Sequence, residues 1–166
     1  MSQSIPEFIK TVGPRPGGRR PEQPPRRTRR QTAAALAGVP LFTGFGARHL
    51  NRLAAESDEL VFEPGQAIVR EDEPGEALFV ILAGQVKVVR GKKTLAQLLP
   101  GDFFGELSAL DAGPRTAAVV AQTPVRVLRL FRHTLLKLIN DEPQVAMKLL
   151  DGIVRRLRQV SKAPRL

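Results

Sequence analysis

A glycine, a glutamate and an arginine lie close together in this 166-residue chain and could jointly hold an anion. Gly105 precedes Glu106, Leu107 and Ser108, which we expect to form the first turn of a short helix, and Arg115 follows nine residues after Glu106. Free amides in a first helical turn attract anions, and a planar guanidinium binds phosphate through two hydrogen bonds. A neighbouring carboxylate accepts hydrogen bonds from hydroxyl groups. The segment therefore predicts a recess for a negatively charged ligand that carries hydroxyls.

The residues around this segment are predicted to form an antiparallel β-sandwich or barrel. Short apolar runs between residues 59 and 131 are separated by Gly or Pro signals every eight to twelve residues, as in such folds. The segment 101–121 interrupts this pattern, and its apolar residues favour a short helix packed against the barrel. Thr116 and Ala117 are small and leave room beside the arginine that precedes them.

Helices are predicted on both sides of the strands. An Ala-rich start near Thr32 and an amphipathic helix over 47–55 come before them, and helices over 132–139 and 143–160 follow. The last helix carries an apolar seam with alternating spacings of four and three, formed by Ala146, Leu150, Ile153, Leu157 and Val160. Such a seam either packs on the chain's own barrel or pairs two copies in a homodimer.

The charge is concentrated at the two ends of the chain. The formal net charge is +10, whereas residues 31–150 carry 13 charges of each sign. Residues 1–31 are rich in Pro and Arg and are predicted to form a disordered basic arm, and residues 32–166 to form one domain. The arm is either a solvated tail or a weak contact for a polyanion. Its RRT and RRQT segments, which end at Thr28 and Thr32, also resemble target sites of basophilic kinases.

Several classes of protein are disfavoured by what the sequence lacks. The chain has no cysteine and no apolar run of eighteen residues, so we expect a reducing, cytoplasmic location and no membrane span. No nucleophile elbow, Walker loop or zincin motif is present. His49 and His133 do not have a metal-ligand spacing. The chain is therefore predicted not to be an enzyme and to need no metal or other cofactor.

The sequence FGELSAL followed by PRTAAVVA resembles the phosphate-binding cassette of the cyclic nucleotide-binding domain. That family includes the bacterial catabolite activators and the regulatory subunits of cyclic-AMP-dependent kinase. The resemblance covers about residues 39–161, and seven residues match at the family spacing, namely Gly105, Glu106, Leu107, Pro114, Arg115, Thr116 and Ala117. It implies a mainly β fold with flanking helices: a β-roll (a jelly-roll-like, double-stranded β-helix) over about 59–131, with C-terminal helices over 132–161.

The resemblance also implies a role for each cassette residue. Glu106 would accept a hydrogen bond from the ribose 2′-hydroxyl, and Arg115 would bind the exocyclic oxygens of the cyclic phosphate. The amides of Leu107 and Ser108 would complete the anion site, and the Thr116 hydroxyl would touch phosphate or base. An alternative interpretation is that Glu106 and Arg115 form a salt bridge that only holds the cassette closed.

A second, weaker resemblance lies in the last helix. IVRRLRQVS resembles the helix that closes over the adenine in the catabolite activators, with Arg156 and Ser161 at polar contact positions. Val160 stands where that family has a threonine. Only KAPRL follows Ser161, so no recognition helix is available and sequence-specific DNA binding is not expected.

These features predict a cyclic nucleotide sensor. cAMP is the favoured ligand, although the Thr116 hydroxyl also allows cGMP. Binding would move the helix over 143–160 and signal to an unidentified protein partner. Two alternatives remain open: an interaction module for protein or nucleic acid with a degenerate pocket, and an inhibitor of a partner enzyme that acts through RRQT like a kinase regulatory subunit.

Overall fold

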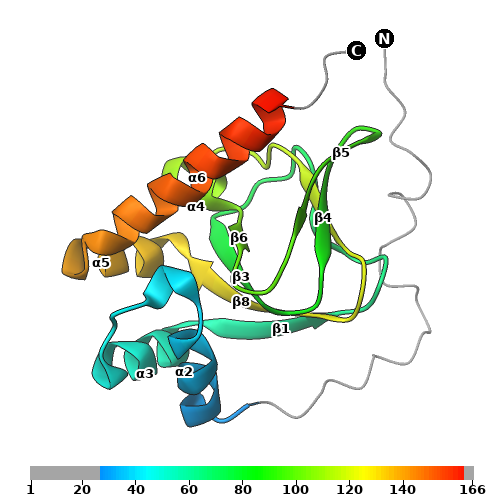
Figure 1. Cartoon of the computed structure of the whole chain (residues 1–166). Helices are drawn as coiled ribbons and strands as arrows, with labels where there is room; N and C mark the ends of the chain where they lie inside the picture. The colour runs from blue at the N-terminus through cyan, green and yellow to red at the C-terminus, as the bar shows by residue number, and fades with distance from the viewer. Residues whose placement is uncertain (1–26, 163–166) are drawn as a thin grey trace.

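The computed structural model describes residues 27–162, with side chains as far as Arg158. Its centre is a roll of two antiparallel four-stranded sheets, and helices lie along one side and one end of the roll (Figure 1). The predicted β-roll with flanking helices is confirmed. No helix among these residues is long and apolar enough to cross a membrane.

The chain passes back and forth between the two sheets. The first has the spatial order β1 (Asp58–Phe62), β8 (Val125–Phe131), β3 (Ala77–Ala83) and β6 (Phe103–Phe104). The second has the order β2 (Ala67–Val69), β7 (Ala118–Ala121), β4 (Val86–Arg90) and β5 (Lys93–Leu98). Consecutive strands β6, β7 and β8 thus alternate between the sheets, so the segment between β6 and β7, which contains residues 105–117, crosses from the first sheet to the second.

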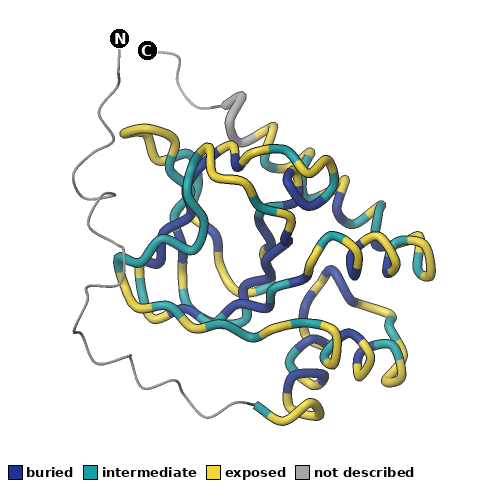
Figure 2. The backbone as a smooth tube through the Cα atoms, turned by 180° about the vertical axis from the view of Figure 1, so that it is seen from behind, coloured by how far each residue is buried: buried dark blue, intermediate teal, exposed yellow. Residues whose placement is uncertain are grey.

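Strand β3 explains why its sequence is one continuous apolar run. Successive side chains of a strand point to opposite faces, and here both faces are covered. Phe79 and Ile81 belong to the cluster between the sheets, whereas Leu78 and Val80 belong to the cluster beneath the helices. Figure 2 shows the buried strands at the centre of the molecule.

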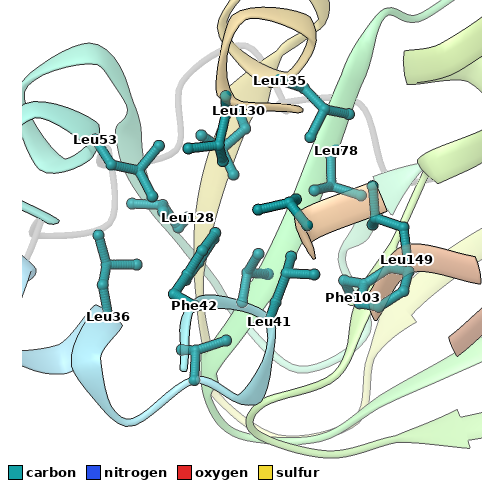
Figure 3. Close-up of a cluster of buried hydrophobic side chains, with 14 of the residues drawn as sticks. Leu36, Leu41, Phe42, Leu53, Leu78, Phe103, Leu128, Leu130, Leu135 and Leu149 are labelled. Carbon is teal, nitrogen blue, oxygen red and sulfur yellow. The ribbon is translucent and has the colours of Figure 1, made fainter. Parts of the chain in front are cut away.

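The helices cover the outer face of the first sheet. They are α2 (Arg29–Ala37), the 3-10 turn η1 (Pro40–Phe42), α3 (Ala47–Glu56), α4 (Glu106–Asp111), α5 (Arg132–Asp141) and α6 (Gln144–Lys162). Figure 3 shows Leu36, Phe42 and Leu53 from the N-terminal helices meeting Leu128 and Leu130 from β8. The N-terminal helices are thus part of the domain core.

The first described helix begins earlier than the predicted Ala-rich start. Helix α2 starts at Arg29, three residues before Thr32, because Thr28 and Gln31 form a capping box. Thr32 is buried and donates a hydrogen bond to Glu59. The RRQT segment is therefore helical, and the rest of the predicted arm, residues 1–26, lies outside the described residues.

Helix α6 uses a different face from the predicted seam to pack on the roll. Val145 and Leu149 are buried, whereas the seam residues Leu150 and Leu157 are 52% and 62% exposed. The side chain of Val160 lies outside the described part. Ala146 and Ile153 of the seam are partly buried, so the predicted seam lies at the edge of the packed face, and Leu150 and Leu157 point outward.

Candidate functional site

The chain turns sharply from β6 into α4 at Gly105. This residue has a φ of +81°, a region that residues with a Cβ rarely adopt. A Cβ at this position would lie 2.7 Å from the carbonyl oxygen of Ala77 and 2.6 Å from Nη1 of Arg115. The turn therefore requires glycine, and it places Glu106, Leu107 and Ser108 in the first turn of α4, as predicted.

Arg115 is held inside the roll by main-chain carbonyl groups. Its side chain is buried, and Nη1 donates hydrogen bonds to the carbonyl oxygens of Ala77 (3.0 Å) and Gly105 (3.2 Å). The guanidinium also lies 5.7 Å from the centre of the Phe79 ring. Burial lowers the pKa of Arg115, and the nearby Glu106 carboxylate acts in the opposite direction. An arginine stays protonated throughout the physiological range, so the structure keeps a fixed cation beside the turn.

Glu106 is paired with α6 rather than with Arg115. Its Oε1 accepts a hydrogen bond of 2.8 Å from Nη1 of Arg156, and its side chain is only 9% exposed. The guanidinium of Arg156 also lies 4.9 Å from the centre of the Phe103 ring. The alternative prediction of a Glu106–Arg115 salt bridge is therefore wrong for this structure, because Arg156 takes that place.

One cavity of about 140 Å³ brings the predicted site residues together. Its lining includes all seven residues predicted to bind the ligand, namely Gly105, Glu106, Leu107, Ser108, Arg115, Thr116 and Ala117. Arg156, predicted as a contact of the closing helix, also lines it. The side chain of Ser161, predicted as the second such contact, lies outside the described residues.

The sequence interpretation missed the other wall of the cavity. Six apolar residues line it, namely Val69, Val88, Leu95, Ala96, Phe104 and Val119. Only Val88 comes from a segment that alternates polar and apolar residues, 85–90, a pattern that could have identified its inward face. Arg90 also lines the cavity and donates from Nε to the carbonyl oxygen of Thr116 at 3.0 Å. Nothing in the sequence around Arg90 indicated this position.

The charges of the cavity favour an anion. Its charged lining residues are Arg90, Arg115, Arg156 and Glu106, three cations against one carboxylate. A cationic recess with an apolar wall and one carboxylate suits a ligand with an anionic group, a hydroxyl and a flat apolar part.

Comparison with known proteins identifies the family. The model of the cyclic nucleotide-binding domain matches residues 59–142. The chain belongs to this family. The match includes α4 and Arg115 and ends before α6. Arg156, the partner of Glu106 on α6, therefore lies outside the matched residues.

Relatives of known name share the domain but are longer. The chain is 34% identical over 131 residues to a CRP-like cAMP-activated global transcriptional regulator of Mycobacterium tuberculosis, covering 76% of this chain and 58% of that protein. It is 37% identical over 136 residues to the cGMP-dependent protein kinase egl-4 of Caenorhabditis elegans, covering 78% of this chain and 17% of the kinase. The catabolite activator protein of Thermus thermophilus superposes with a TM-score of 0.65 at 35% identity, covering 74% of this chain and 60% of that one. The chain thus spans less than two thirds of each of these relatives.

Proposed function

We propose that this chain is a receptor module for a 3′,5′-cyclic nucleotide, with cAMP as the favoured ligand. The observation that carries the proposal is the position of Arg115 and Glu106 on one cavity, one a buried cation and the other an acid at the start of α4. A cyclic nucleotide presents a monoanionic phosphate and a ribose 2′-hydroxyl on one rigid ring system. These two groups match the two side chains.

Each part of the ligand has a partner in this proposal. The phosphate binds the Arg115 guanidinium and the amides of Leu107 and Ser108, and the 2′-hydroxyl donates to Glu106. The base lies against the apolar wall formed by β4 and β5. Thr116 contributes its hydroxyl to phosphate or base. One of the named relatives is activated by cAMP and another depends on cGMP. The proposal therefore keeps both ligands, with cAMP as the favoured one and cGMP as the second candidate.

The signal passes to α6 in this proposal. The helix lies against the cassette at Glu106, which Arg156 binds, and against β6 just before it, where a Cβ on Gly152 would clash with the ring of Phe103. A ligand that contacts Glu106 therefore acts next to the helix. The ligand shifts the equilibrium between two positions of α6 only to the extent that it binds the protein more tightly when α6 is in one of them. The output is a contact with a protein partner, and the module itself catalyses no reaction and uses no cofactor.

Titration calorimetry with cAMP tests the proposal. Wild type is expected to bind, and Arg115→Ala to weaken binding by at least about tenfold, because a hydrogen bond to a charged group contributes about 1.5–3 kcal/mol. Arg52→Ala is the matched control, since Arg52 is half-exposed on α3 and does not line the cavity. Absence of heat with wild type, or equal affinity of wild type and Arg115→Ala, would contradict the proposal.

The two alternative functions predict different results. An interaction module with a degenerate pocket would show no response to any cyclic nucleotide. An inhibitor that acts through RRQT would need this segment to reach a partner's cleft, yet Thr32 is 6% exposed and bound to Glu59. The helical, partly buried state of the segment therefore favours the receptor over the inhibitor.

A homodimer through α6 is part of the proposal. The helix exposes Met147, Leu150, Val154 and Leu157, whose spacings of three, four and three are those of a coiled-coil seam. Sedimentation velocity is expected to show a dimer for wild type and a monomer for Leu150→Lys. A monomeric wild type at high concentration would rule out this arrangement. The proposal also includes a cytoplasmic location and weak polyanion contact by the basic N-terminus.

A further inference from the structure

The loop between β2 and β3, residues 70–76, holds the main chain of Arg115 on both sides. The amide of Asp72 donates to the carbonyl oxygen of Arg115 at 2.8 Å, and the amide of Arg115 donates to the carbonyl oxygen of Glu73 at 3.0 Å. Asp72 has a φ of +65°, which aspartate tolerates better than most residues. The loop lies about forty residues before Arg115 in the sequence, yet it fixes the point from which the Arg115 side chain extends.

Gly75, in the same loop, lies against the far end of that side chain. A Cβ on Gly75 would be 2.5 Å from Nε, 2.6 Å from Nη2 and 2.8 Å from Cζ of Arg115. Gly105 takes a similar place beside Nη1 of the same guanidinium. The guanidinium therefore sits in a slot between two glycines, and Nη1 bonds to the Ala77 carbonyl oxygen.

The two glycines differ in what a side chain would displace. At Gly105 a Cβ would meet the backbone oxygen of Ala77, and φ is +81°, so a substitution strains the fold. At Gly75 the three nearest atoms all belong to the end of the Arg115 side chain. A side chain at Gly75 therefore moves the guanidinium and leaves the backbone in place.

We propose that Gly75 is a positioning residue for the phosphate contact, and that the β2–β3 loop is a part of the ligand site outside the cassette. The inference rests on the proposed function, because it assigns to Gly75 the placement of the group that binds phosphate. Arg115 is buried, so a displaced guanidinium has little space in which to find the phosphate again. A charge-assisted hydrogen bond depends strongly on distance and angle.

A double-mutant cycle with cAMP tests this proposal. Calorimetry is carried out on wild type, Gly75→Ala, Arg115→Lys and the double variant. Lysine keeps a cation but has none of the guanidinium atoms that a Cβ at position 75 would meet. Gly75→Ala alone is expected to weaken cAMP binding by about tenfold or more, the equivalent of losing one charge-assisted contact. In the Arg115→Lys background the same change is expected to alter affinity less than about twofold, because coupled residues are not additive.

Two controls separate positioning from general damage. Gly46→Ala places a methyl group where no atom lies within 4 Å, at an ordinary φ of −69°, and is expected to bind like wild type. The melting temperature of ligand-free Gly75→Ala is expected to stay close to that of wild type. Wild-type affinity of Gly75→Ala, or an equal loss in both backgrounds, would overturn the inference while leaving the receptor intact. Failure of wild type to bind any cyclic nucleotide would instead overturn the receptor and the inference together.

Discussion

The two sides of the cavity are fixed in different ways. On the cassette side, Arg115 is bonded to main-chain groups of two other segments, and glycines flank its guanidinium. On the helix side, the second half of α6 lies against Phe103 of β6 through Gly152 and against Glu106 of the cassette through Arg156, and neighbouring residues such as Val154 are exposed. Main-chain contacts deep in the roll resist displacement, whereas a few side-chain contacts at the surface can be exchanged. In the proposed function, the cassette side is the rigid wall that recognises the ligand, and α6 is the movable wall that reports it.

The largest expected effect concerns the first half of α6, where the helix is anchored. Leu149→Ala should destabilise the protein by about 2–5 kcal/mol, because it opens a cavity in the core, where Leu149 is 2% exposed. At protein concentrations low enough to keep the chain monomeric, Leu150→Ala, at a position 52% exposed, should change the free energy of unfolding by less than about 0.5 kcal/mol. Urea unfolding monitored by circular dichroism measures both. Equal effects at the two leucines would mean that α6 does not pack as described.

The next effect concerns Glu106, which belongs to the cassette and is bonded to Arg156 of α6. Glu106→Gln should weaken cAMP binding by about 1.5–3 kcal/mol, because a neutral amide replaces a charged acceptor for the ribose hydroxyl. The affinity for 2′-deoxy-cAMP should hardly differ between wild type and the variant, since this ligand lacks the hydroxyl. Calorimetry with both ligands gives the comparison. A parallel loss for the two ligands would show that Glu106 does not bind the sugar.

The smallest expected effect on stability concerns the movable wall. Arg156→Ala should lower the free energy of unfolding by about 1–3 kcal/mol, because it removes the hydrogen-bond donor of Glu106, whose side chain is 9% exposed. Amide hydrogen exchange should nevertheless become faster in α6 beyond Gly152 and stay unchanged in β3. Equal acceleration in β3 would show that the helix and the roll open as one unit, and the contrast between the two walls would be lost.

The cassette was predictable because its chemistry is local in the sequence. Gly105, Glu106 and Arg115 lie within one short segment, and the requirement for a glycine before a helical turn is a property of the backbone alone. The strands were predictable for a similar reason, since Gly and Pro signals mark where each one ends.

The contacts that complete the site could not be predicted in this way. Arg156 and Glu106 are fifty residues apart, and Gly75 meets Arg115 across a similar span, so only the folded chain brings these pairs together. Helix α6 presents a related difficulty because apolar residues occur on more than one of its faces. The spacing of Leu150 and Leu157 fits a packing seam as well as that of Val145 and Leu149, and only contact with the roll decides which face is buried.

A thermal-shift panel of cyclic nucleotides is the most direct test of the central claim that Arg115 and Glu106 form a cyclic nucleotide site. Ligand that binds only the folded state stabilises it in proportion to the logarithm of its concentration above the dissociation constant. The melting temperature of wild type should rise steadily with cAMP and remain constant with adenosine, which has no phosphate. An unchanged melting temperature with every 3′,5′-cyclic nucleotide, at concentrations up to the millimolar range, would contradict the account.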